Sequence, residues 1–150
     1  MILRHLTVVL LALSAAAITV AGCGSTSSSA PETLPKAAFL HKADGICERA
    51  GNEQTVKAAA YLEDHQNAKE ADLVVPAGIP PLEKELKELR DLGLPQGHED
   101  EAEAFLAEVE KGLQALKEEP SSALSPKTNP YKKANELGEK LGLVDCARNP

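Results

Sequence analysis

An apolar run without charged residues lies near the beginning of the chain, before any periodic pattern of apolar and polar positions. It covers residues 6–20, between Arg4 and the small residues Ala21 and Gly22. A basic start, an apolar centre and small residues at the end are typical of an export signal peptide. A membrane-spanning helix would need about 20 apolar residues with a cationic flank, whereas here a Ser-rich segment follows. We therefore expect residues 1–22 to be a cleaved signal peptide.

The next segment has no apolar period. Residues 24–35 read GSTSSSAPETLP, a composition dominated by Ser, Thr and Pro. Such segments connect domains without forming a core of their own. We expect residues 23–35 to be a tether that carries a folded domain, residues 36–150.

Apolar residues recur at intervals of three and four from residue 36 onward, which predicts amphipathic helices. The first helix is expected over 36 to about 62. A short helix over 68–75 is expected to end in a kink or loop, because Pro76, Gly78, Pro80 and Pro81 follow it. The first expected helix has its apolar positions at Phe39, Leu40, Ala43, Ile46, Cys47 and Ala50.

Three further helices follow in the pattern. One begins after Pro81, with a stripe at Leu82, Leu86 and Leu89, and ends before Gly93 and Pro95. The clearest one covers residues 99 to about 118; its first turn is acidic, which compensates the helix dipole. Its apolar positions are Ala102, Phe105, Leu106, Val109, Leu113 and Leu116, and those of the last helix are Tyr131, Ala134, Leu137 and Leu141.

The last helix carries signals for both of its ends. Asn129 and Pro130 suit an N-cap and a first-turn proline, and Gly142 suits the position after the last turn, with Leu143 folding back onto Leu137. The fold class predicted from the whole pattern is all-α: a small up-and-down bundle of about four helices.

Composition and charge narrow the expected partners. The chain is 43% hydrophobic but only 3% aromatic, with no Trp, so the core must consist mainly of Leu, Val and Ala. The formal net charge is −7. Because phosphate groups and anionic headgroups would repel such a domain, we expect no nucleic-acid partner and no direct electrostatic binding to a membrane.

Cys23 stands directly after the apolar run. The residues Val20, Ala21, Gly22 and Cys23 resemble the bacterial lipobox, in which the Cys is diacylglycerylated and then exposed by signal peptidase. The resemblance implies a protein attached to the cell membrane through its lipid, on the extracytoplasmic face. Two or three acyl chains hold a protein stably, whereas one binds only marginally. The alternative is an ordinary signal peptide with a cysteine there by chance.

Cys47 and Cys146 are the two remaining cysteines. An even number in an exported chain predicts a disulfide, which here would close a loop of about 100 residues. A pair of metal ligands or a redox-active thiol are the alternatives. Both lack support from a C-x-x-C spacing or a neighbouring His.

Other polar residues offer no recognised chemistry. His41, His65 and His98 fall in separate expected elements without a metal-binding spacing, and we expect them on the surface. Asn52 and Asn135 lie near inward faces, where they could line a pocket, although such residues more often bond the backbone. We therefore expect no catalytic residue, no metal site and no cofactor.

Two short segments carry a wider resemblance. Residues 43–47 (ADGIC) and 141–147 (LGLVDCA) resemble the two ends of small actinobacterial lipoproteins, in which an A-D-x-I-C helix opens the domain and a G-L-x-x-C segment closes it. The resemblance implies a helical fold with a cysteine pair and a Gram-positive-type envelope, and it implies no activity.

These inferences lead to three functional hypotheses. The first is a lipid-anchored, non-catalytic module that works through contacts with an envelope protein or a small ligand. The second is a carrier that holds a small apolar ligand between its helices, which would require a cavity in the bundle. The third, an enzyme, would require polar groups with shifted pKa values gathered in a cleft.

Overall fold

The computed structural model describes residues 33–148. The expected signal peptide, the lipobox residues Val20 to Cys23 and most of the tether lie outside the described residues. The described elements, in order, are α1 (Lys36–Asp64), α2 (Glu70–Leu73), the π-helical segment η1 (Val74–Gly78), α3 (Ile79–Asp91), α4 (Glu99–Glu118), the 3₁₀ segment η2 (Pro120–Leu124) and α5 (Lys132–Leu141).

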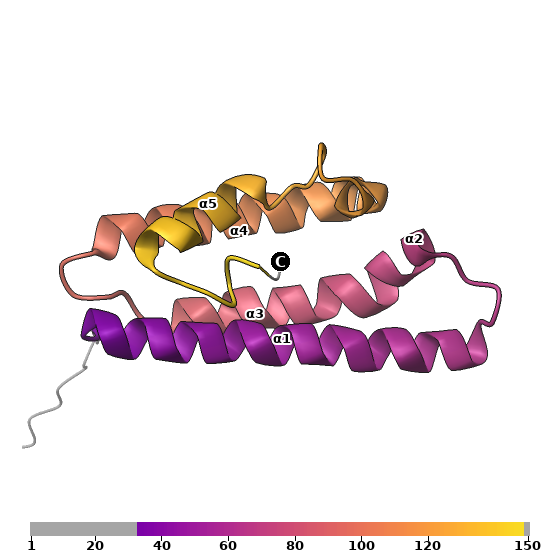
Figure 1. Ribbon diagram of the computed structural model, residues 1–150, viewed down its shortest axis with the longest axis horizontal. Coiled ribbons are helices and arrows are strands. Elements are labelled where there is room, and N and C mark those ends of the chain that lie inside the picture. The colour runs from indigo at the N-terminus through magenta and orange to yellow at the C-terminus, as the bar shows by residue number, and fades with distance from the viewer. Residues whose placement is uncertain (1–32, 149–150) are drawn as a thin grey trace, which may run out of the picture.

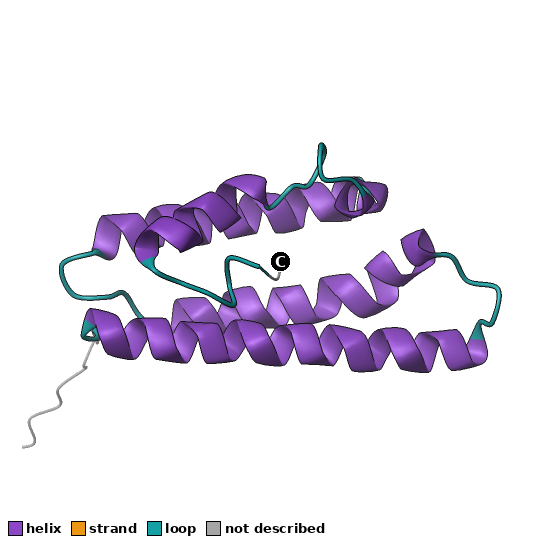
Figure 2. Ribbon diagram, in the orientation of Figure 1, coloured by secondary structure: helices purple, strands orange, loops and turns teal. Residues whose placement is uncertain are grey.

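The helices form two antiparallel pairs, α1 with α3 and α4 with α5, and α3 joins the pairs by packing against α4 (Figure 1). Figure 2 shows that loops connect the helices at the two ends of the bundle. Because α2, η1 and α3 follow one another without a loop, they form one bent rod, and the fold has four rods. The predicted all-α, up-and-down bundle is confirmed.

Helix α1 follows the predicted period closely and extends for 29 residues, about 43 Å at 1.5 Å per residue. Its buried positions are confined to the first half: Phe39, Ala43, Ile46, Cys47 and Ala50. The second half has no buried position, and Val56 there is 68% exposed. The first half of α1 is therefore the part that belongs to the core.

The proline-rich stretch between α2 and α3 differs in part from its prediction. The sequence predicts a kink or loop there and a new helix after Pro81; the chain bends but stays helical through a π-helical turn, and α3 already begins at Ile79. The N–H of Ile79 donates to the carbonyl of Val74, five residues earlier. Pro80 and Pro81 lie in the first turn of α3 and have no N–H to donate to the carbonyls of the preceding turn. The wider turn therefore accommodates the prolines without breaking the rod.

Helix α5 is bounded by the predicted signals, although it begins two residues late. The side-chain oxygen of Asn129 accepts a hydrogen bond from the N–H of Tyr131 at 2.8 Å, and the first helical residue is Lys132. Gly142 has φ 103°, and the N–H of Leu143 donates to the carbonyl of Gly138 at 2.9 Å. This closing turn buries Leu143 in the core, where Leu137 packs against the same cluster.

One apolar cluster joins all four rods. Its largest fully buried side chains include Phe39, Leu89, Phe105 and Leu141, one from each helix of the two pairs. Gly112 allows α4 to pack closely against the residues that lead into α5. The ring of Tyr131 lies against Gly112, and a Cβ atom at residue 112 would come within 2.7 Å of a ring carbon. The segment after α5 then turns back between the two pairs toward α1 (Figure 1).

Leu34 fixes the beginning of the described chain to the bundle. Its N–H donates to the carbonyl of Leu94 at 3.0 Å, and its carbonyl accepts from the N–H of Gln96 at 2.7 Å. Both partners belong to the connection between α3 and α4. The chain therefore enters the fold beside that connection, at the first turn of α1.

Candidate functional site

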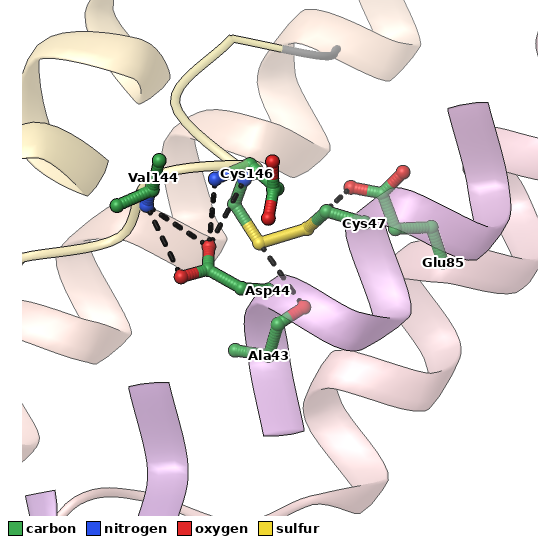
Figure 3. Close-up of a disulfide and its surroundings, with 7 residues drawn as sticks. Ala43, Asp44, Cys47, Glu85, Val144 and Cys146 are labelled. Carbon is green, nitrogen blue, oxygen red and sulfur yellow. Dashed lines mark hydrogen bonds between the residues drawn. A yellow bond between two sulfur atoms is a disulfide. The ribbon is translucent and has the colours of Figure 1, made fainter. Parts of the chain in front are cut away.

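The buried disulfide Cys47–Cys146 is the centre of the candidate site (Figure 3). Cys47 lies on the core face of α1, and Cys146 lies in the segment after α5. Their Cα atoms are 5.0 Å apart, within the range of ordinary disulfides. Cys47 is 0% and Cys146 3% exposed. The predicted pairing is confirmed, and it links the two ends of the folded domain.

Asp44 holds the segment that carries Cys146. It lies one turn before Cys47, and its Oδ1 accepts hydrogen bonds from the N–H groups of Val144, Asp145 and Cys146 at 3.0, 2.9 and 3.3 Å. Oδ2 also accepts from Val144, at 3.2 Å. A carboxylate is a strong acceptor for such N–H groups. The segments 43–47 and 141–147, singled out in the sequence, therefore meet through this carboxylate and the disulfide (Figure 3).

Glu85 of α3 approaches the disulfide from the opposite side. Its Oε1 lies 3.3 Å from the Sγ atom of Cys47, and the residue is only 5% exposed. A disulfide sulfur carries no hydrogen, so this contact is a hydrogen bond only when Glu85 is protonated and donates. The other oxygen, Oε2, is buried without a hydrogen-bond partner among the described residues.

The surroundings of Glu85 favour its protonated form. Burial raises the pKa of its carboxyl to about 8, and the negative charge of Glu88 adds to the shift. A buried carboxyl without a cationic partner is expected to behave in this way, because ionisation in a poorly solvated site is costly. At neutral pH Glu85 is therefore mainly a neutral acid that donates its proton toward Cys47.

The charged side chains around Glu85 pair with one another. Glu85 lines a small hollow between α1 and α3. Two ion pairs line the same hollow: the nitrogen–oxygen distance is 3.0 Å between Arg49 and Glu88 and 2.9 Å between Lys84 and Glu53. The hydrogen bond between Lys84 and Glu53 raises the pKa of the lysine and lowers that of the carboxyl. Both nearby cations are thus engaged with half-buried carboxylates.

Two further polar atoms are buried near α5. The hydroxyl of Tyr131 and the side-chain oxygen of Asn135 have no hydrogen-bond partner among residues 33–148. Burial, with a smaller contribution from the negative charge of Glu85, raises the pKa of the Tyr131 hydroxyl. The hydroxyl therefore stays protonated at physiological pH.

The other candidate residues are not brought together. His41 and His65 are exposed, and His65 stacks on Tyr61. Nδ1 of His98 lies 2.5 Å from Oε2 of Glu101, which follows one turn later at the surface. Asn52 is exposed. In the part of the chain that the structure describes, no group of three His, Cys, Asp or Glu side chains is arranged to hold a metal ion.

Glu85 was not singled out in the sequence, although its position carries a signal. It lies three residues after Leu82 and four before Leu89, so it belongs to the same apolar stripe of α3. An acidic residue at such a position is either at the edge of the stripe or buried. Glu83 and Lys87, by contrast, pair with Lys117 of α4 and with Asp91.

The chain matches no known family model, no curated protein and no solved structure. None of the described helices is both long enough and apolar enough to span a bilayer. The features that bear on function are therefore the disulfide, the carboxylates around it and the lipobox-like residues that precede the described domain.

Proposed function

We propose that the protein is a lipid-anchored module on the extracytoplasmic face of the cell membrane, where it acts through contacts with other envelope components and not by catalysis. The observation that carries the proposal is the Cys47–Cys146 disulfide. Structural disulfides persist in oxidising compartments, whereas cytosolic thiols are kept reduced. Of the three cysteines, this pairing leaves Cys23, which follows the lipobox-like residues Val20, Ala21 and Gly22.

The position of Leu34 supports a tethered arrangement. Leu34 is hydrogen-bonded to the connection between α3 and α4, so the chain that leads to Cys23 leaves the bundle at that end. A fully extended chain from Cys23 to Leu34 spans at most about 40 Å. A lipid at Cys23 would hold the bundle within that distance of the membrane surface, where its acidic exterior favours lipid-mediated over electrostatic attachment.

The polar groups of the core support a binding module more than an enzyme. Asp44 is engaged by backbone N–H groups, and Glu85 faces a disulfide sulfur. The second hypothesis, a carrier of an apolar ligand, is not favoured, because Phe39, Leu89, Phe105 and Leu141 fill the centre of the described bundle. Contacts with partners would then involve the bundle's exterior.

The proposal is tested by the intact mass of the protein purified from membranes, measured before and after reduction. We expect the mass of residues 23–150 plus a diacylglyceryl group, with a gain of two hydrogens on reduction. We also expect Cys23→Ser to abolish lipidation and to remove the protein from the membrane fraction.

Ser28→Ala, a change in the same Ser-rich segment, is the matched control and should leave the protein in the membrane fraction. A Cys23→Ser variant that still sediments with membranes would favour anchoring by an uncleaved signal peptide. An unmodified mass for the native protein would overturn the proposed anchor.

A further inference from the structure

We infer that Glu85 is the proton donor of a thiol–disulfide couple formed by Cys47 and Cys146: when an external dithiol opens the bond, Glu85 protonates the departing Cys47 sulfur. The inference goes beyond the proposed function and does not depend on the lipid anchor. It rests on the 3.3 Å contact between Oε1 of Glu85 and Sγ of Cys47, in a site where the carboxyl is 5% exposed.

The two sulfurs have different neighbours, which decides the direction of the reaction. Sγ of Cys146 lies 3.3 Å from the carbonyl oxygen of Ala43, whereas Sγ of Cys47 faces the Glu85 carboxyl. A carbonyl oxygen disfavours a thiolate beside it, while a carboxylic acid can stabilise and then protonate one. Cys47 is therefore the better leaving group, and Cys146 is the sulfur that the reductant attacks.

The chain position of Cys146 agrees with this assignment. Cys146 lies in the segment after α5, outside any helix, whereas Cys47 lies within α1 and is completely buried. Displacing a short segment without helix or strand requires less of the fold to open than displacing a 29-residue helix. The hydrogen bonds from the 144–146 backbone to Asp44 are the contacts that must loosen first.

Reduction by the dithiol takes place in two exchange steps. A thiolate of the dithiol attacks Sγ of Cys146 and forms a mixed disulfide, while the Cys47–Cys146 bond breaks and its electron pair goes to Cys47. Glu85 gives its proton to that sulfur and becomes a carboxylate. The second thiol of the reductant then releases Cys146 as a thiol and closes the reductant's own disulfide, so the protein gains two electrons and two protons; Glu85 is reprotonated from water.

The other charged and titratable groups around Glu85 are less suited to this role. The two cations of the hollow are paired with Glu53 and Glu88, and the charges between α3 and α4 also form pairs of their own. A pKa of about 8 keeps Glu85 protonated at neutral pH, when a donor is needed. The other charged and titratable groups near the site are Arg49 and Glu53 on α1, Lys84 and Glu88 on α3, the pairs Glu83–Lys117 and Arg90–Glu110, Tyr131 before α5, and Asp145 beside Cys146.

The test is the rate at which dithiothreitol reduces the native, processed protein between pH 6 and 9.5, followed by alkylation and mass spectrometry of the peptides that contain Cys47 and Cys146. Each rate constant is divided by the concentration of reductant thiolate. We expect the normalised rate to fall by up to about tenfold between pH 7 and pH 9, as Glu85 loses its proton. Glu85→Gln should be about tenfold slower at pH 7 and should show no such fall.

A purely structural Glu85 gives the opposite sign. Ionisation of Glu85 destabilises the fold in either case and opposes the expected fall. A purely structural Glu85 would have this effect alone, so the normalised rate of the wild-type protein would rise with pH. A rising or flat wild-type profile, or a Glu85→Gln variant with the wild-type fall, overturns the inference. The control is Glu103→Gln, which replaces an exposed residue of α4 and should keep the wild-type dependence of the rate on pH. The wild-type measurement decides the sign even if a variant folds poorly.

Discussion

The carboxylate of Asp44 accepts hydrogen bonds from the N–H of Val144, at 3.0 Å to one oxygen and 3.2 Å to the other, across 100 residues of chain. The same carboxylate accepts from the next two N–H groups. Asp44 thereby accepts hydrogen bonds from three backbone N–H groups of a segment that contains no helix or strand. One helical turn later, Cys47 binds the same segment covalently. The end of the domain is thus held twice by one helix.

Replacement of this carboxylate should be costly. We expect Asp44→Ala to lower the free energy of unfolding by about 2 kcal/mol, because charge-assisted hydrogen bonds are lost and backbone donors are left without a partner. Denaturant unfolding under oxidising conditions measures the loss. The control is Glu48→Ala, which replaces an exposed residue on the next turn of α1 and should lower the free energy of unfolding by less than about 0.5 kcal/mol. Equal losses in the two variants would contradict the role given to Asp44.

The disulfide should act as one unit. Cys47→Ser and Cys146→Ser should each lower the free energy of unfolding by about 3–4 kcal/mol, below the roughly 4.7 kcal/mol that chain entropy alone predicts for a loop of about 100 residues. The double variant should lose hardly more than either single one, because a shared bond is removed only once. Wild-type protein unfolded in the presence of reductant should resemble the variants. Strictly additive losses would argue against the bond.

The sequence predicted the helices because each depends on a local signal. The apolar period located α1 and α4, and Gly142 marked the end of α5 through a conformation that glycine adopts easily. The turn at Pro76 could not be predicted in the same way. A proline has no N–H to donate to the carbonyl four residues earlier, so an ordinary α-helical hydrogen bond is missing there. Whether the chain then forms a loop or a wider helical turn depends on packing against α1.

The candidate site was only partly predictable. The cysteine pair followed from an even count in a chain that we expect to be exported, but the contacts of Asp44 and Glu85 join residues that are 38 or more positions apart. Such contacts depend on how the rods pack, and a single sequence does not show that. Glu85 could have been suspected from its place in the stripe of α3, although the same place suits a surface residue at the edge of the stripe.

The contact between Gly112 and Tyr131 gives a packing prediction. A Cβ at residue 112 would lie 2.7 and 2.8 Å from two ring carbons of Tyr131 and 3.1 Å from the carbonyl of Pro130. We expect Gly112→Ala to lower the free energy of unfolding by about 2 kcal/mol, the usual cost of overpacking. The control is Gly45→Ala on α1, where the nearest atom is the flexible end of Arg49 at 3.7 Å. Because Ala is a better helix former than Gly, Gly45→Ala should raise the free energy of unfolding by up to about 1 kcal/mol. Thermal unfolding of both variants tests the contrast, and a stabilising Gly112→Ala would refute it.

Glu85 makes the stability of the fold depend on pH. The pKa of its carboxyl is about 8 in the folded protein, against an ordinary value of 4.5. The unfolded chain therefore releases this proton at lower pH than the folded one. The contribution of Glu85 to the free energy of unfolding is largest below pH 4.5, falls as the pH rises, and is fully lost above about pH 8. At pH 7 the loss is about 3 kcal/mol.

Replacing Glu85 by Gln should remove this dependence, because the amide is similar in size and does not ionise. We expect Glu85→Gln to raise the free energy of unfolding relative to wild type, with a difference that grows by about 3 kcal/mol between pH 5 and pH 8. Denaturant unfolding at several pH values, without reductant, measures it. Glu103→Gln should give a difference that hardly changes with pH, since that residue is exposed. If the Glu85→Gln difference were also constant, the carboxyl would have to titrate near its ordinary pKa, with water or a cation reaching it between α1 and α3.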